Sequence, residues 1–154
     1  MKLRIETDPD CAEEVVIRAR EITDEILKIK RSIESVLSGP GEIAVKRSGG
    51  TSYLSLSEIL FFETGADRVW AHTARDCFEC PMTLSDLMEK LPESFERASK
   101  SSIVSTAKIS ALSRSPTGVG TASFYKCEKI VFISRMYFRS VREKIEKTRL
   151  KNKK

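Results

Sequence analysis

The period of the hydrophobic positions changes near residue 40, which divides the chain into two parts. In the first part, apolar residues recur at alternating spacings of three and four: Ala12, Val15, Ala19, Ile22, Ile26, Ile29, Ile33 and Val36. This spacing predicts an amphipathic helix with heptad character that begins near Asp10 and ends at SGPG, residues 38–41. The alternating segment KLRIE, residues 2–6, predicts a short strand before the helix.

After residue 41 the apolar positions alternate with polar ones, which predicts β-strands. EIAVKR and TSYLSL flank SGG and predict a hairpin. Further strands are predicted in LSEILFFET, RVWAHT, CFECP, IVSTAKISALSR, TASFYK and KIVFIS, with a turn at residues 65–68. The segment SFERASKSS, residues 94–102, is expected to be a connection at one edge of the sheet.

Two helices are predicted among these strands. TLSDLMEKL opens with Thr83 in a capping-box-like position and should end before Pro92. Ser134 is expected to cap a last helix that runs to about Lys147. Its apolar face is expected to carry Val141 and Ile145.

The predicted fold class is mostly β, with an antiparallel β fold and short helices preceded by an N-terminal strand and a long helix. The expected parts are an arm at residues 1–41, a β domain at 42–147 and a basic tail at 148–154. We expect the arm to form a homodimer through residues 12–36, because a seam this regular usually has a partner helix. Burial of the arm on its own chain is the alternative.

Charge is distributed unevenly along the chain. Residues 1–42 carry 7 Lys/Arg against 10 Asp/Glu, and residues 43–93 carry 5 against 8. Residues 94–154 carry 15 against 4, so this last segment supplies more than the whole net charge of +5. A positive field concentrated in one segment suits a phosphate backbone or an anionic membrane surface.

The basic segment contains two stretches whose residue types suit nucleic acid. RASKSSIVSTAKISALSRS, Arg97–Ser115, has eight Ser/Thr and four Lys/Arg, and no acidic residue occurs between Glu96 and Glu128. A second basic edge follows Ser134, where arginines recur along a helix start: Arg135, Arg139 and Arg142. Hydroxyl and cationic groups bind phosphate oxygens, and Arg or Lys can also donate to guanine in the major groove.

The residues give little support to an enzyme, a metal site or a cofactor. DCFEC is a lone C-x-x-C, and its Cys77 and Cys80 would point to opposite faces of a strand. The only histidine, His72, is expected to be a packed or surface imidazole, and no glycine-rich phosphate loop or small-molecule substrate site is recognisable. The chain lacks an apolar run near the roughly 20 residues that cross a bilayer, and its start lacks the order of a signal peptide, so it is expected to be cytoplasmic.

In and around the two basic stretches, the sequence resembles the LytTR family of bacterial DNA-binding domains, from about Glu42 to about Lys147. The family pattern has an Ile-x-x-Ile/Phe-Glu start, a Leu-Pro-x-x-Phe-x-Arg turn, a basic-Ser-x-Ile-Val strand entry and a Ser-Arg pair. The chain offers YLSLSEILFFETGADRVWAHT, LPESFER, KSSIV, KISAL and KIVFISRMYFRSVRE in that order.

The resemblance implies an elongated antiparallel fold that meets DNA through loops rather than through an inserted recognition helix. Carried over residue by residue, the implied contacts are Asp67 and Arg68, then Ser99, Lys100 and Ser101, then Arg135 and Met136. Arg97 is expected to bind phosphate or to brace its loop, and Arg139 belongs to the second basic edge. The chain has Ser99-Lys100-Ser101-Ser102 where the family often has His-Arg-Ser-Tyr, so no base preference is carried over.

The expected function is therefore that of a sequence-specific regulator of transcription that binds double-stranded DNA. Many relatives carry a receiver domain, but about 40 residues of arm cannot house one, so a stand-alone regulator is expected. A membrane-bound regulatory protein is a possible further partner of the arm. The alternative function is a protein-interaction module whose arm binds a partner and whose basic surface does not bind specific DNA.

Overall fold

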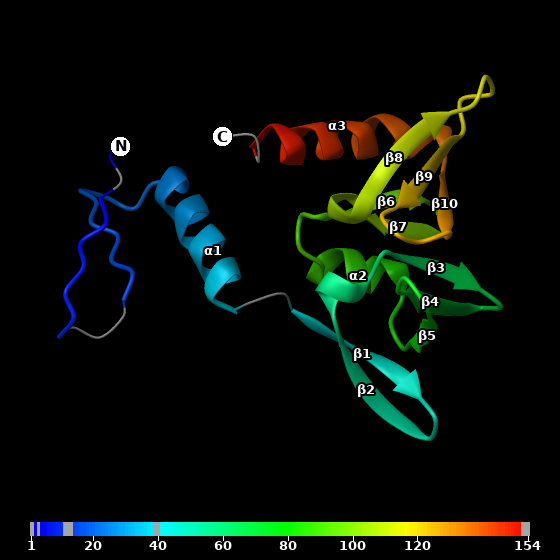
Figure 1. The fold of residues 1–154 in the computed structure, drawn as a ribbon, viewed down its shortest axis with the longest axis horizontal. Helices are drawn as coiled ribbons and strands as arrows, with labels where there is room; N and C mark the ends of the chain where they lie inside the picture. Colours follow the sequence, from blue (N-terminus) through cyan, green and yellow to red (C-terminus); the bar gives the residue numbers. More distant parts are fainter. Residues whose placement is uncertain (1, 3, 11–13, 39–40, 152–154) are drawn as a thin grey trace. The chain divides into compact units, whose positions relative to one another are not determined.

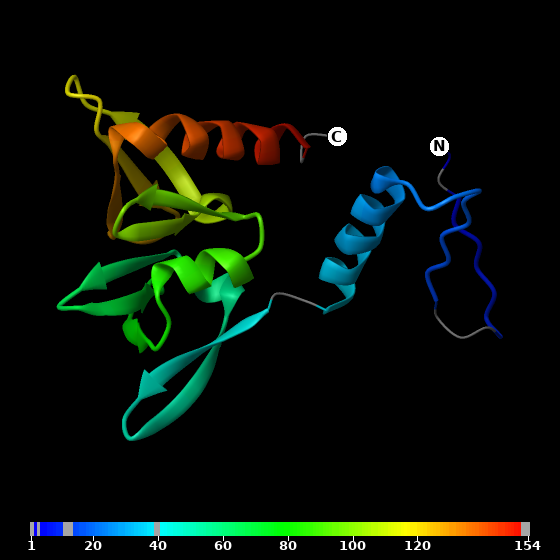
Figure 2. The ribbon, with the colours of Figure 1, turned by 180° about the vertical axis from the view of Figure 1, so that it is seen from behind.

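The computed structural model describes residues 2, 4–10, 14–38 and 41–151, and it separates into two compact units. One unit spans Met1–Gly39 and the other spans Pro40–Lys154 (Figures 1 and 2). Among the described residues, no helix is both long enough and apolar enough to cross a membrane.

The described residues of the first unit contain one helix, α1, at Asp24–Ser38. The backbone N–H of Ile26 donates to Oγ1 of Thr23 at 3.3 Å, and two acidic residues, Asp24 and Glu25, follow in the first turn. Both features stabilise a helix start at this point, because they satisfy free amides and favour the positive end of the helix dipole.

The predictions for residues 2–23 are therefore wrong in two respects. The helix expected from near Asp10 begins only at Asp24, and the described residues of KLRIE form no strand. The β-branched run VVI, residues 15–17, is weak in helix propensity, and a short strand without a paired neighbour is unstable. Of the predicted seam, Ala12 lies outside the described residues.

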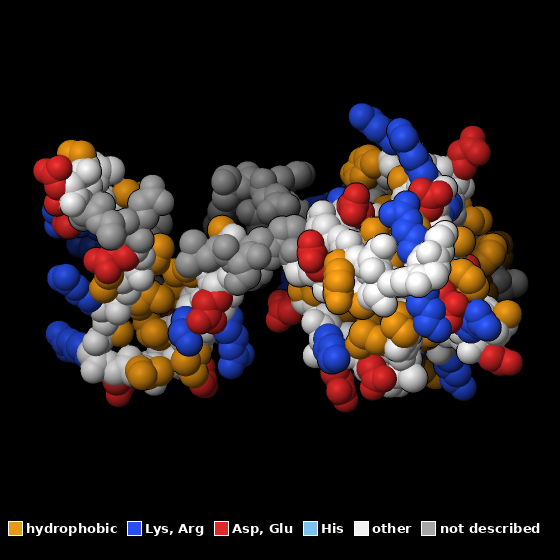
Figure 3. Space-filling model, turned by 90° about the horizontal axis from the view of Figure 1, so that it is seen from below, with side chains coloured by type: hydrophobic (Ala, Val, Ile, Leu, Met, Phe, Trp, Pro, Cys, Tyr) orange, Lys and Arg blue, Asp and Glu red, His pale blue; other side chains and the backbone are white. Residues whose placement is uncertain are grey.

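Apolar side chains of the first unit remain in contact with solvent. Val15, Val16 and Ile22 are exposed, and Ile26, Ile29 and Ile33 of α1 are partly exposed. On the face drawn in Figure 3, hydrophobic side chains gather in the middle of this unit, with charged side chains around them.

The second unit is built on a seven-stranded sheet with the order β2-β1-β5-β4-β3-β7-β6, in which every neighbouring pair is antiparallel. The strands are β1 Glu42–Arg47, β2 Gly50–Ser55, β3 Phe61–Gly65, β4 Arg68–His72, β5 Cys77–Cys80, β6 Phe95–Ser99 and β7 Ser102–Ser105. The predicted hairpin of EIAVKR and TSYLSL is confirmed as β1 and β2.

Strand β6 corrects one prediction, because SFERASKSS was expected to be only a connection. The pairing of β6 with β7 shifts register between Arg97 and Ser99. A bulge of this kind interrupts the alternation of buried and exposed residues, so the segment does not have the sequence pattern of a strand.

A second sheet has three antiparallel strands in the order β10-β9-β8. They are β8 Ile109–Arg114, β9 Gly120–Phe124 and β10 Ile130–Ile133. The predicted single strand IVSTAKISALSR is divided by a 3-10 turn, η2, at Thr106–Lys108, so that β7 and β8 lie in different sheets. Another 3-10 turn, η1 at Leu56–Glu58, precedes β3.

The helices of this unit are α2 at Leu84–Lys90 and α3 at Arg135–Lys151. The prediction for α2 is confirmed, since the Thr83 side chain accepts from the backbone N–H of Asp86 at 3.1 Å. Helix α3 begins after Ser134 as predicted but continues beyond Lys147 into the expected tail. The predicted apolar face of α3, Val141 and Ile145, is buried.

Two hydrophobic cores lie on the two faces of the central strands. Phe61 packs with residues of the three-stranded sheet and α3, whereas its neighbour Phe62 packs with residues that include Leu87 of α2. Successive residues of a strand point to opposite faces, so β3 is buried on both sides at Phe61 and Phe62, and β7 is buried along its whole length. The predicted mostly β, antiparallel fold is confirmed.

Candidate nucleic-acid interface

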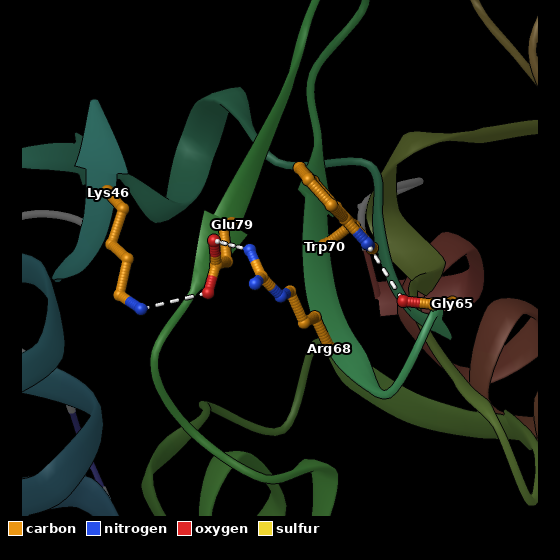
Figure 4. A network of polar contacts seen from close by, with 5 residues as sticks. All are labelled: Lys46, Gly65, Arg68, Trp70 and Glu79. Atoms are coloured by element: carbon orange, nitrogen blue, oxygen red, sulfur yellow. Dashed lines mark hydrogen bonds and ion pairs between the residues drawn. The ribbon is translucent and has the colours of Figure 1, made fainter. Parts of the chain in front are cut away.

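The turn between β3 and β4 carries Asp67 and Arg68, the first two implied contacts. Gly65 pairs with Arg68, so the turn has two central residues, and both have positive φ angles: 51° at Ala66 and 59° at Asp67. A two-residue turn of this kind matches the twist of the strands it joins. The indole Nε1 of Trp70 donates to the carbonyl of Gly65 at 3.1 Å, which fixes the turn (Figure 4).

The Arg68 side chain is held by a carboxylate from a neighbouring strand. Its Nη1 lies 3.0 Å from Oε2 of Glu79, and Nζ of Lys46 lies 2.9 Å from the other oxygen, Oε1 (Figure 4). The hydrogen bond from Lys46, with help from Arg68, lowers the pKa of Glu79. The side chain of Arg68 is still 60% exposed, so its guanidinium is oriented by the protein and accessible to a ligand.

The turn between β6 and β7 carries the next three implied contacts, Ser99, Lys100 and Ser101. The Ser99 hydroxyl oxygen accepts from the backbone N–H of Ser101 at 3.1 Å and lies 2.7 Å from the hydroxyl of Ser102. Arg97 donates from Nη1 to the carbonyl of Lys100 at 3.1 Å. Of the two roles expected for Arg97, this contact is the bracing one, while the Lys100 side chain is exposed.

Two backbone hydrogen bonds join the three implied segments into one edge. The N–H of Thr64, at the end of β3, donates to the carbonyl of Ser101 at 2.8 Å, and the N–H of Ser134, before α3, donates to the carbonyl of Ala98 at 2.8 Å. We call this edge the contact rim: Asp67, Arg68, Ser99, Lys100, Ser101, Arg135 and Met136.

The start of α3 contributes exposed side chains to the contact rim. Arg135 is exposed, and the apolar side chain of Met136 is 74% exposed. Arg139 lies one turn further along and pairs with Glu143 at 3.0 Å, in an i,i+4 ion pair on the helix surface. Arg139 thus already has an acidic partner.

The loop between β8 and β9 also reaches this edge, which the sequence reasoning missed. A Cβ atom at Gly118 would lie 2.8 Å from Cδ of Arg135, and Gly118 has a φ angle of +92°. Arg114 donates from Nε to the carbonyl of Gly118 at 3.3 Å, and its guanidinium lies 4.9 Å from the ring centroid of Phe138. The one available signal in the sequence was Gly118 of SPTGVG, because a positive φ favours glycine.

Cys80 of β5 and His72 of β4 show the burial and packing of structural residues. Cys77 is exposed and Cys80 is buried, as expected for opposite faces, and burial raises the pKa of the Cys80 thiol. The His72 ring stacks on Phe61 at 4.3 Å, and burial lowers its pKa. Within residues 2, 4–10, 14–38 and 41–151, no group of three His, Cys, Asp or Glu side chains could hold a metal ion.

The sequence profile of the LytTr DNA-binding domain matches residues 49–146. The chain belongs to the LytTr DNA-binding domain family. The matched region of this LytTr chain includes every residue of the contact rim, since it begins in the β1–β2 hairpin and ends within α3.

A solved structure supports the fold of this LytTr domain independently. The LytTr DNA-binding domain of a proposed methyl-accepting/DNA response regulator from Bacillus cereus superposes with a TM-score of 0.63 at 19% identity. The superposition covers 70% of this chain and 98% of that domain. At this level of identity the match concerns the fold.

Curated relatives match over a shorter region. Two uncharacterized HTH-type transcriptional regulators of Staphylococcus aureus, from strains NCTC 8325 and N315, are each 29% identical to the chain over 92 residues. The match covers 60% of this chain and about 62% of the length of these relatives. The described residues of the LytTr chain do not include a helix-turn-helix, because strands separate each helix from the next.

Proposed function

We propose that this protein is a regulator of transcription that binds a specific double-stranded DNA sequence and contacts the major groove through the contact rim. The observation that carries the proposal is the joining of three cation- and hydroxyl-bearing segments by the bonds Thr64–Ser101 and Ser134–Ala98. Membership of a DNA-binding domain family supports it, and so does the description of the Staphylococcus aureus relatives as transcriptional regulators.

The residue types suggest which side chains of the contact rim would contact bases and which would contact phosphates. Arg68, Lys100 and Arg135 are exposed cations that can donate to guanine O6 and N7. Ser99 and Ser101 can donate to phosphate oxygens, which positions the protein without reading sequence. Asp67 would be repelled by phosphate but can accept from the amino group of cytosine. In this proposal Arg97 acts through Lys100, whose carbonyl it holds.

The test compares Lys100→Ala with Lys147→Ala on a selected genomic site and on a random duplex. Lys147 is an exposed lysine of α3 twelve residues after Arg135, about 18 Å along the helix. We expect Lys100→Ala to cost about 1–3 kcal/mol on the selected site and less on random DNA. Lys147→Ala should change both affinities alike, measured by fluorescence anisotropy. Equal losses of affinity for both variants on both duplexes would show that Lys100 does not take part in base recognition.

We also propose that the chain is a homodimer through residues 12–36, a range that includes most of α1. A helix of 15 residues is marginally stable by itself, and the apolar side chains around it are exposed or partly exposed. Light scattering on Ile29→Asp and Ile33→Asp is the test, with Ser32→Asp on the same helix as a control. Both isoleucine variants should be monomers. A monomeric wild type would favour capture of another protein, such as a membrane-bound regulator, by the arm.

The alternative function is a protein-interaction module whose basic surface does not bind specific DNA. A titration of random duplex at low salt separates the two functions, because non-specific DNA binding is mainly electrostatic. Absence of binding near micromolar protein would favour the interaction module. Binding would support the DNA-binding function, and the comparison of Lys100→Ala with Lys147→Ala then tests its specificity.

A further inference from the structure

The β1–β2 hairpin brings additional cations next to the contact rim. Lys46 and Arg68 hold the two oxygens of one carboxylate, at 2.9 and 3.0 Å from Glu79. A carboxylate separates its two oxygens by about 2 Å, so the Lys46 ammonium and the Arg68 guanidinium nitrogens lie within about 8 Å of each other. The hairpin belongs to none of the segments for which DNA contact was expected.

The cations keep donors that Glu79 does not use. A lysine ammonium has three N–H donors and a guanidinium has five, whereas the contacts to Glu79 use one nitrogen of each. Both side chains are more than half exposed, at 57% for Lys46 and 60% for Arg68, while Glu79 is only 18% exposed. An anion can therefore approach the outer side of both cations without displacing the carboxylate.

A surface hollow of about 350 Å³ lies beside this ion-pair group. Its walls include Lys46, Glu79 and Trp70, together with Arg47 and Phe78. The guanidinium of Arg47 lies 5.2 Å from the ring centroid of Phe78, which orients a second exposed cation of the hairpin. Lys46 shares one face of the sheet with Glu79 and Arg68, whereas Arg47 leaves β1 on the opposite face, over Phe78, so a cation borders the hollow on each face.

We propose that Lys46 and Arg47 each bind a phosphate of the DNA backbone, on the flank of the base contacts made by the contact rim. The major groove is about 12 Å wide, so a phosphate at its wall lies about 6 Å from the groove centre. With Arg68 in the groove, a cation held within about 8 Å reaches that wall. Figure 1 draws the β1–β2 turn below the β3–β4 turn, so the proximity of Lys46 to Arg68 follows from their shared contact with Glu79.

This inference rests on the proposed function, and it makes a different prediction from that of a base contact. A phosphate contact carries no sequence information, so its loss should weaken binding to a selected site and to random duplex equally. Each phosphate contact adds about 0.9 to the slope of log affinity against log salt. Between about 50 and 200 mM salt, one such contact accounts for a factor of about three.

The experiment measures this slope for Lys46→Ala, Arg47→Ala and the charge-matched control Lys90→Ala, an exposed lysine at the end of α2. In each hairpin variant, the loss of affinity between the two salt concentrations should be about threefold smaller than in the wild type, on both duplexes. Lys90→Ala should show the same loss as the wild type. Melting curves establish that each variant is folded, and Lys46→Arg should restore the slope.

The outcomes separate this inference from the function on which it rests. If the hairpin variants have the slope of Lys90→Ala while Lys100→Ala still loses discrimination, the hairpin site is wrong and the base contacts stand. If the wild type does not bind duplex DNA, the proposed function fails first. A hairpin variant that changes the ratio of selected to random affinity by more than about threefold would also overturn a phosphate role.

Discussion

The backbone amide of Ser134 donates to the carbonyl of Ala98 at 2.8 Å and thereby ties the start of α3 to β6. Lys100 follows Ala98 by two residues and Arg135 follows Ser134 by one, so this single bond keeps both cations on one edge. Two exposed cations on one edge can address the same duplex, whereas cations on opposite sides of a domain cannot.

Gly118→Ala is predicted to disturb Arg135 as well as the backbone. The new Cβ would lie 2.8 Å from Cδ of Arg135, and the φ angle of +92° is unfavourable for alanine by about 1–2 kcal/mol. Gly49→Ala is the matched control, because its φ is +80° and nothing lies within 4 Å of its Cβ. Both variants should lose similar stability, but only Gly118→Ala should lower the preference for the selected DNA site. The same preference in both variants would separate the β8–β9 loop from DNA recognition.

Glu79→Gln is predicted to raise the affinity for random duplex and to lower the ratio of selected to random affinity. The change removes a negative charge near the DNA and weakens the contact that orients Arg68 at 3.0 Å. Binding titrations on the two duplexes measure both effects. Glu89→Gln, at an exposed position of α2, is the control. An unchanged ratio in Glu79→Gln would show that the orientation of Arg68 does not contribute to recognition.

Phe62→Ala is predicted to cost about 3–5 kcal/mol in the free energy of unfolding, as is usual when a buried aromatic ring is deleted. Phe62 is fully buried on β3, where its ring is tilted by 50° to that of Phe95, with the ring centroids 5.9 Å apart. Phe132→Ala removes a ring that is 63% exposed and should cost less than about 1 kcal/mol. Urea unfolding measures both variants. Similar costs would contradict the assignment of β3 as the buried centre of the sheet.

The free energy of unfolding is predicted to fall below about pH 6.5 because of His72. Burial lowers the pKa of His72 from its ordinary value of 6.5; Glu63 opposes this shift and Lys129 adds to it. As the pH falls through 6.5, the unfolded chain gains a proton at His72 before the folded chain does. Stability is therefore full above this pH and decreases as the pH falls towards the lowered pKa.

Urea unfolding of the wild type and His72→Gln at about pH 7.5 and about pH 5.5 tests this sign. The wild type should lose more stability than the variant between the two conditions. The carboxylates titrate mostly at lower pH, so they contribute little to the difference. An equal loss in both proteins would assign the pH dependence to other groups.

Elements whose cause lies within a few residues could be predicted from the order of the amino acids alone. Thr83 specifies the start of α2 through one hydrogen bond to the amide of Asp86, three residues away. The alternation in EIAVKR and TSYLSL specifies a hairpin, and Gly49 supplies the positive φ of its turn. The residue types of the contact rim were also visible, because hydroxyl and basic side chains outside an apolar pattern are typical of exposed turns.

Which of these segments lie side by side became known from the folded chain. Glu79 holds Arg68 across a strand pair, and Gly118 lies against Arg135 although 17 positions separate them in the chain. Strand β6 could not be predicted either, because its bulge interrupts the alternation of buried and exposed residues. In the arm, the regular spacing of apolar residues did not make residues 14–23 helical. Capping and periodicity are set by neighbours within a turn or two, whereas strand order and loop contacts depend on how the whole chain buries its two cores.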